Sequence, residues 1–350
     1  MYRKLAIVTL LAVLLTGCTA ASRPALAPGP HAELATKQVA FRARPLEFVR
    51  DGVWRGEGVA YGMHRDGQRP FGLSPSRAQM AEDLKIIASH WQAIRVYGAA
   101  DLGDSLLRTI KDEHIGLTVM LGAWIDVEER LPDSTGAVKR SPDLLARNRR
   151  EVDAAIRLAK AYPGIVNSIC VGNETQVSWT DHRSPPSVLI RYLREVRANT
   201  KLPVTTADDF NFWNKPESDA VARECDFIVL HYHPLWNGKQ LEEAVDATRA
   251  TLDDIKSRHP GQTIVLGETG WATQYNDTGD QGKLMKGRAG EAEQATFFAA
   301  FHAWVQKERV PSYIFEAFDE NWKGGERADE VEKHWGLYHA DRTPKSAMAN

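Results

Sequence analysis

Short apolar runs alternate with longer amphipathic stretches along most of the chain. Apolar, β-branched runs that are too short for a helix predict buried strands. These strands are expected at residues 58–62, 93–97, 117–121, 165–174, 204–207, 227–233, 264–268 and 313–318. Helical patterns lie between them, for example over residues 76–91 and 144–161. Strands that alternate with helices in this way predict an α/β fold, a parallel sheet closed as a single-domain (β/α)8 TIM barrel.

The two longest predicted loops cover residues 126–141 and 274–288. The second is rich in glycine and carries Lys283, Lys286 and Arg288. Loops of this length are either solvated connections or walls and lids of a binding groove. The sequence leaves both interpretations open.

The N-terminus has the pattern of a targeting segment. Arg3 and Lys4 precede an apolar run over residues 5–15, which is too short to span a bilayer as a mature helix. The run ends in Leu-Thr-Gly and then Cys18, which resembles a bacterial lipoprotein signal. An ordinary secretory peptide with an incidental cysteine is the alternative.

The lipoprotein interpretation divides the chain into three parts. Residues 1–17 would be the signal peptide, residues 18–50 the acylated Cys18 with an Ala/Pro-rich tether, and residues 51–350 the barrel domain. Stable anchoring requires more than one acyl chain. Thr19, and no Asp, follows the cysteine. By resemblance to Gram-negative lipoproteins, we expect a cell-envelope protein anchored in the outer membrane, periplasmic or surface-exposed, if the source is Gram-negative.

Composition narrows the classes of partner. The formal net charge is −2, so no long-range field favours nucleic acid, and we expect a monomer. Apolar residues make up 43% of the chain, enough for one large core. Cys170 lies in one predicted strand and Cys225 just before another, and these two strands are not neighbours in a barrel, which predicts two buried free thiols and no disulfide.

Two segments place a carboxylate where an apolar strand ends. Glu174 closes the run Val-Gly-Asn-Glu, and Glu268 stands in Leu-Gly-Glu-Thr-Gly-Trp. Catalytic residues of barrel enzymes lie at the C-terminal ends of the strands. One such glutamate is also typical of a structural ion pair, but two on separate strands predict a pair of carboxylates facing each other across one mouth.

These segments resemble the acid/base and nucleophile motifs of the family-17 glycoside hydrolases. Further segments are similar to that family: GVAYG at 58–62, IRVY at 94–97, HPLW at 233–236 and FEAFDENWK at 315–323. The last departs from the fungal motif at Asn321, where the fungal members have Pro. The resemblance implies a retaining β-1,3-glucanase or β-1,3-glucanosyltransferase with a (β/α)8 barrel. It implies a β-glucan oligo- or polysaccharide as partner, and neither cofactor nor metal.

Carried onto this sequence, the resemblance implies a role for each site residue. Glu268 would be the nucleophile, and Glu174 would protonate the leaving group and then deprotonate the acceptor, with the two carboxyl groups about 5–5.5 Å apart. Asn173 would bind the sugar 2-hydroxyl, His233 would orient Glu268 or the sugar, and Arg95 would keep Glu268 ionised. The remaining substrate-binding candidates are Tyr61, Tyr97 and Trp271, as stacking or hydroxyl contacts, and Glu316, Glu320 and Lys323, as a polar cluster for sugar hydroxyls. The structural alternative for each is an ion pair or a core aromatic.

Two other function classes remain open. His231 and His233 alternate on one strand, and Asp208 and Asp209 follow the preceding strand, so a metal-dependent barrel hydrolase is possible in principle. A non-catalytic glycan-binding lipoprotein with the same barrel is the second alternative, although such proteins usually lose a catalytic carboxylate. The sequence does not separate hydrolysis from transglycosylation, nor endo from exo action.

Overall fold

The structure is a computed structural model that describes residues 41–50, 52–130 and 138–349. The predicted signal peptide, Cys18 and most of the predicted tether lie outside the described residues. The compact unit described below begins at Arg42.

Parallel strands close into a barrel of eight, in the order β10-β3-β4-β5-β6-β7-β8-β9, which confirms the predicted (β/α)8 fold. Most of the strands are short apolar runs, and they are largely buried on both faces, as parallel strands are, although β7 reads Val-Thr-Thr-Ala-Asp-Asp. Their bounds are β3 Glu57–Ala60, β4 Ala93–Val96, β5 Thr118–Ala123, β6 Val166–Asn173, β7 Val204–Asp209, β8 Ile228–His231, β9 Ile264–Thr269 and β10 Ser312–Ile314.

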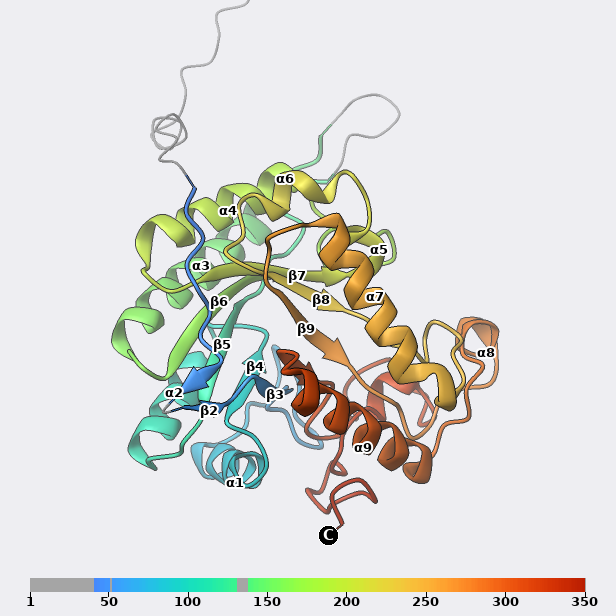
Figure 1. The fold of residues 1–350 in the computed structure, drawn as a ribbon. Coiled ribbons are helices and arrows are strands. Elements are labelled where there is room, and N and C mark those ends of the chain that lie inside the picture. Colours follow the sequence, from blue (N-terminus) through green and yellow to red (C-terminus); the bar gives the residue numbers. More distant parts are fainter. Residues whose placement is uncertain (1–40, 51, 131–137, 350) are drawn as a thin grey trace, which may run out of the picture. The chain divides into compact units, whose positions relative to one another are not determined.

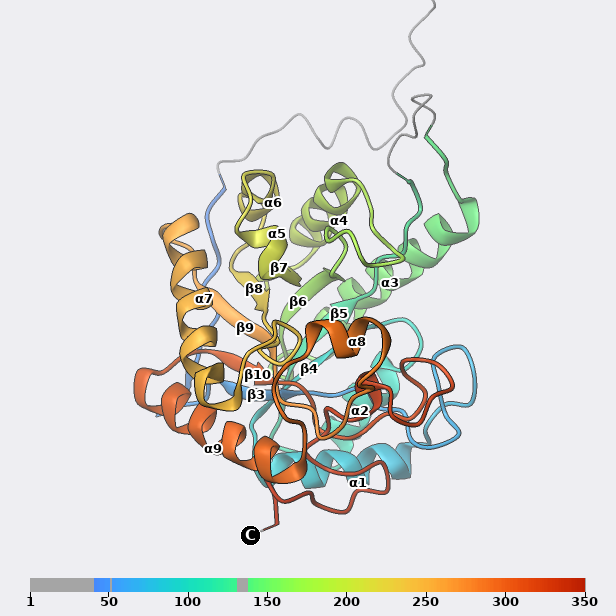
Figure 2. The same cartoon turned by 90° about the vertical axis from the view of Figure 1, so that its right-hand side faces the viewer.

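Helices surround the strands (Figures 1 and 2). Their bounds are α1 Arg77–Ala88, α2 Gly103–Asp112, α3 Pro142–Ala161, α4 Pro186–Asn199, α5 Phe210–Trp213, α6 Ser218–Ala222, η2 Leu241–Glu243, α7 Ala244–Arg258, α8 Gly279–Leu284, α9 Glu291–Glu308 and η3 Val331–Lys333. Local sequence sets where they begin. Ser76 caps α1 and forms a capping box with Gln79, and Ser141 caps α3 just before Pro142.

The core has two layers. A small cluster that includes Met120, Cys170, Phe227 and Tyr313 draws on strands all around the barrel and fills its interior. A much larger cluster lies between strands and helices. Cys170 and Cys225 are both buried and free, as predicted.

Two segments differ from their predicted form. The last strand ends at Ile314 and not at residue 318, because the backbone of Glu316 pairs instead with Trp335 and Leu337. The predicted loop 274–288 contains the short helix α8. The predicted loop 126–141 lies partly outside the described residues.

Residues 42–50 are attached to the barrel, so the packed part of the chain begins before the predicted boundary at residue 51. The Arg44 guanidinium donates to the carbonyls of Thr200, Leu202 and Arg197, and its backbone N–H donates to Asp226. A two-stranded hairpin, β1 Val49–Arg50 with β2 Val53–Trp54, follows. None of the described helices is long and apolar enough to cross a membrane.

Candidate active site

An irregularity in β6 delivers the first carboxylate. Pairing with β7 shifts by one residue between Cys170 and Asn173, and Gly172 takes a left-handed conformation with φ +77°. A bulge of this kind re-aims the side chains that follow it and is common beside active sites. Glu174 itself has φ +48°, a conformation that is costly for a residue with a Cβ and that clusters at functional positions.

A second irregularity, in β9, delivers the other carboxylate. The register with β8 shifts so that His231 stands opposite Glu268 instead of Gly267. A Cβ on Gly267 would lie 2.1 Å from Cγ1 of Val229, so only glycine fits there. The extra residue turns Glu268 toward the barrel axis, where Val229 and His231 already face.

Glu268 is buried and held by three side chains. Arg95 Nη1 lies 2.6 Å from Oε1, the Tyr97 hydroxyl donates to the same oxygen at 3.0 Å, and His233 Nε2 lies 3.4 Å from Oε2. Burial opposes ionisation, but His231, His233 and Arg95 together outweigh it and hold the pKa of Glu268 well below its ordinary value. The predicted contacts of Arg95 and His233 with this carboxylate are therefore present, whereas Tyr97, predicted as a contact for the sugar, donates its hydroxyl to Glu268.

The side chain of Asn173 has a fixed orientation. Arg95 Nη2 lies 2.5 Å from Asn173 Oδ1, and a guanidinium can only donate. The amide oxygen must therefore face Arg95, which leaves the two Nδ2 protons for an acceptor such as a sugar hydroxyl. This orientation fits the role that the resemblance implies for Asn173.

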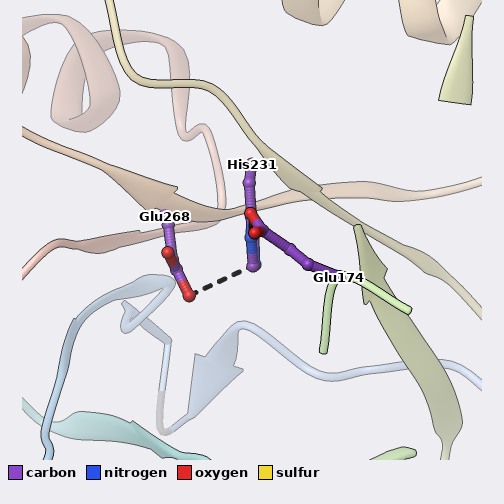
Figure 3. A group of neighbouring side chains, drawn as sticks. All are labelled: Glu174, His231 and Glu268. Carbon is purple, nitrogen blue, oxygen red and sulfur yellow. Dashed lines mark hydrogen bonds and ion pairs between the residues drawn. The ribbon is translucent and has the colours of Figure 1, made fainter. Parts of the chain in front are cut away.

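Glu174 is a quarter exposed, whereas Glu268 is nearly covered. His231 lies between them at the end of β8 (Figure 3), with Nδ1 2.9 Å from Glu174 Oε1 and Nε2 3.5 Å from Glu268 Oε1. Ligand atoms of these three residues all lie within 4.8 Å of one another. One oxygen of Glu174 therefore lies within 4.8 Å of one oxygen of Glu268, a closeness in keeping with the roughly 5–5.5 Å between the carboxyl groups of retaining glycosidases.

The predicted polar cluster forms after β10. Lys323 Nζ lies 2.7 Å from Glu316 Oε2 and 2.7 Å from Glu320 Oε2, and Trp322 Nε1 donates to Glu320 at 3.0 Å. Burial and the neighbouring Glu320 raise the pKa of Glu316 against the opposing effect of Lys323. The cluster is internally paired, and the ring of Trp322 beside it is 38% exposed.

Two predicted substrate contacts are wrong. Tyr61 is buried, and its hydroxyl donates to Asp83 Oδ2 on α1 at 2.9 Å, so it is a core residue. Trp271 is 1% exposed, donates through Nε1 to the carbonyl of Arg288, and lies against Phe297 of α9. Its ring fills the space between barrel and helix and offers no face to a sugar.

Two residues that lie in the site were not predicted from the sequence as site residues. His231 contacts both carboxylates, but the sequence suggested it only as a metal ligand. Glu332, in η3, is half-buried; burial raises its pKa, and the charges of Lys323, His233, Glu174 and Glu268 all act on it. No strand-end pattern marks Glu332, because it reaches the site from the segment after the last strand.

The predicted set of metal ligands is engaged in other contacts. Both oxygens of Asp208 accept backbone N–H groups, from Gln176 and Asp209, and Asp209 Oδ1 accepts from Asn211. Glu174, His231 and Glu268 do converge, but the Arg95 guanidinium lies 2.6 Å from Glu268 and would repel a cation. The donor set therefore does not fit a metal ion.

Residues 58–336 match the family described as the BtgE/BtgC glycoside hydrolase domain. The chain belongs to this family of glycoside hydrolases. It is also 30% identical to a glucan 1,3-β-glucosidase of Arthroderma benhamiae over 302 residues, covering 79% of this chain and 86% of that one. The resemblance to β-1,3-glucan enzymes that the sequence motifs indicated is thereby confirmed.

Two solved structures of other proteins have a similar fold. An endo-laminarinase from Formosa Hel1_33_131 aligns with a TM-score of 0.70 at 25% identity, covering 83% of this chain and 84% of that one. A Rhizomucor miehei β-1,3-glucanosyltransferase, an active-site mutant solved with laminaritriose, aligns with a TM-score of 0.66 at 21% identity, covering 84% and 96%. At this identity, the second likeness supports the fold alone.

Proposed function

We propose that this glycosidase acts on β-1,3-glucan with retention of configuration, through a glycosyl-enzyme on Glu268. The observation that carries the proposal is that oxygens of Glu174 and Glu268 lie within 4.8 Å of each other, with Glu268 held ionised and Glu174 more open to solvent. The glucan specificity rests on the names of its relatives, a glucan 1,3-β-glucosidase and an endo-laminarinase.

In the first step, an oxygen of Glu268 attacks the anomeric carbon while the glycosidic C–O bond breaks. Glu174 gives its proton to the departing oxygen, so the leaving sugar departs as a neutral alcohol. Arg95 and Tyr97 keep the attacking carboxylate ionised and fix its direction. Asn173 Nδ2 binds the 2-hydroxyl, a contact that strengthens in the transition state.

In the second step, Glu174 is the base. It takes a proton from water or from a sugar hydroxyl, whose oxygen attacks the same carbon and releases Glu268. Water gives hydrolysis and a sugar gives transglycosylation, and the difference lies in how well the acceptor side of the groove holds sugar. The half-exposed ring of Trp322 is a suitable stacking surface beside this mouth.

A non-catalytic glycan-binding protein is disfavoured by the cost of the site. A binding protein would gain nothing from a buried, ionised carboxylate matched to a guanidinium and two imidazoles, since such groups are expensive to desolvate. Their arrangement is explained by chemistry at Glu268.

The test uses laminari-oligosaccharides and two variants. Glu268→Ala should lose turnover, and added azide should restore an α-glycosyl azide product. Glu174→Ala should retain activity mainly on substrates with good leaving groups, and azide should give the β-product. Loss of activity on both kinds of substrate in Glu174→Ala would contradict its role as acid. Mass spectrometry of the wild-type products separates shortened chains from lengthened ones.

We also propose that the protein is anchored to the cell envelope through acylated Cys18. The support is the sequence alone: an apolar run over residues 5–15 that ends at this cysteine. Cys18→Ser should release the protein into the soluble fraction. A wild-type mature protein that is already soluble and begins at another residue would contradict the proposal.

A further inference from the structure

His231 lies beside both catalytic carboxylates. It is fully buried, and its place on β8 is in register with Asp209 of β7 on one side and Glu268 of β9 on the other. Figure 3 shows the ring beside Glu268 and Glu174. Each ring nitrogen is near a different carboxylate: Nδ1 is hydrogen-bonded to Glu174 at 2.9 Å, and Nε2 lies 3.5 Å from Glu268 without a hydrogen bond.

The two contacts restrict where protons can lie. A neutral imidazole has one N–H and one bare nitrogen. Glu268 is ionised, and both Arg95 and Tyr97 already donate to its Oε1, so that oxygen carries no proton. A bare Nε2 facing it would set two lone pairs against each other. The proton of the neutral ring therefore belongs on Nε2.

It follows that Nδ1 is bare or belongs to an imidazolium. A bare nitrogen and a carboxylate oxygen do not approach to 2.9 Å unless a proton lies between them. The proton is either on Glu174 and donated to Nδ1, or on Nδ1 and donated to Glu174.

We infer that the proton which Glu174 delivers to the leaving group is held jointly by Glu174 and His231, and that His231 is a positioning residue for the acid step. This inference rests on the proposed function and goes beyond it. When the glycosidic bond breaks, the shared proton passes to the leaving oxygen, and one proton stays on the imidazole. When the acceptor attacks, its proton returns to the same pair, so the site is restored.

Acidic groups surround the Glu174–His231 pair. Burial raises the pKa of Asp208, Asp209 and Glu332, and the charge of Glu174 acts on each of them. The charged and titratable groups that face the pair are Asp208, Asp209, Glu268, Glu332, His233 and Arg95. An imidazole between Glu174 and Glu268 separates the two carboxylates and lets the pair bind one proton together.

The test compares His231→Gln with His233→Gln. Glutamine keeps an amide but cannot hold the shared proton, whereas His233 contacts Glu268 with no hydrogen bond to Glu174 among the contacts of the described chain. For laminari-oligosaccharides, His231→Gln should lower kcat/KM about tenfold or more at pH 7. It should also move the alkaline limb of the pH profile of kcat/KM to lower pH by about one unit. On a dinitrophenyl β-glycoside, whose departure needs no acid, the loss should be less than about threefold.

His233→Gln should lower kcat/KM by the same factor for both substrates and leave the alkaline limb of the pH profile in place. An unmoved limb in His231→Gln, or an equal loss on both substrates, would overturn the inference.

A second measurement needs no folded His231 variant. Histidine is labelled with 15N, and the signals of His231 are assigned as those that change in Glu174→Gln. In the wild-type protein, this ring should carry a proton on Nε2 throughout the active pH range. A deprotonated Nε2 would overturn the inference. Failure of the wild type to cleave any β-1,3-glucan would instead remove the proposed function, and the nitrogen spectrum would still report on the shared proton.

Discussion

At the scale of single residues, the site depends on carboxylates at the ends of barrel strands and on the direction of the side chains beside them. Glu174 and Glu268 each follow an apolar run, and the end of a barrel strand fixes where they lie. Trp271 lies only three residues after Glu268, but the chain has left the strand, and its ring faces α9. His231 could be assigned only once the register between β8 and β9 was known.

The low pKa of Glu268 predicts the acid limb of the pH profile. The nucleophile must be ionised, and its pKa in the fold is depressed below the ordinary value of about 4.3, so kcat/KM should persist as the pH falls past that value. Arg95→Gln removes a donor 2.6 Å from Oε1, so the pKa of Glu268 should rise and the limb should move to higher pH. Initial rates between pH 3 and 8 measure both. A wild-type limb above about 5 would contradict the assignment.

At the scale of elements, the apolar runs predict strands well because a buried parallel strand needs little else. The bulges in β6 and β9 could not be predicted, since they depend on how each strand pairs with its neighbour. The predicted strand 313–318 was too long for a similar reason: after Ile314 only single bonds continue to Thr269 and Ala60, and the backbone of Glu316 pairs with residues 335 and 337.

The contact between the segment after β9 and α9 yields a stability prediction. Trp271→Ala should lower the free energy of unfolding by about 3–5 kcal/mol, because a buried indole leaves a large cavity. Trp322→Ala, at a ring that is 38% exposed, removes the hydrogen bond from Nε1 to the buried Glu320, so it should cost less, about 1–3 kcal/mol, and should lower kcat/KM on longer oligosaccharides. Urea unfolding and rates against chain length provide the comparison. Unchanged stability in Trp271→Ala would contradict the core assignment.

The polar cluster of Glu316, Glu320 and Lys323 after β10 yields a second stability prediction. Lys323→Met leaves Glu316 and Glu320 buried without their shared cation, and breaking such a pair costs about 3–5 kcal/mol. Because both carboxyl groups can escape the penalty by taking up protons, the destabilisation should be larger at pH 8 than at pH 5. Thermal unfolding at the two pH values checks this. A pH-independent loss would show that the lysine contributes packing and not charge.

At the scale of the whole molecule, barrel closure could be predicted because the count of strand-helix units matches the fold. The start of the packed chain could not, since the residues before the hairpin have no periodic pattern. Arg44 bonds to three backbone carbonyls, and only the structure reveals that attachment.

Truncation tests this boundary. A chain that begins at Arg42 should melt within about 1 °C of the full chain, whereas one that begins at Gly52 loses the contacts of Arg44 and the β1–β2 pairing. Each of those hydrogen bonds contributes about 0.5–1.5 kcal/mol, so the melting temperature of the chain that begins at Gly52 should fall by several degrees. Equal melting temperatures for the two truncated chains would place the boundary at residue 51 after all.

The central claim is that Glu268 forms a covalent bond with the sugar while Glu174 handles the proton. The most direct measurement is to trap that bond with a 2-deoxy-2-fluoro-β-laminaribiosyl fluoride, whose glycosyl-enzyme hydrolyses slowly, and to map the added mass by peptide mass spectrometry. The account predicts one added glycosyl group per chain, on the peptide that contains Glu268, and none in Glu268→Gln. A label on another residue, or no label on an enzyme that cleaves the parent glucan, would contradict it.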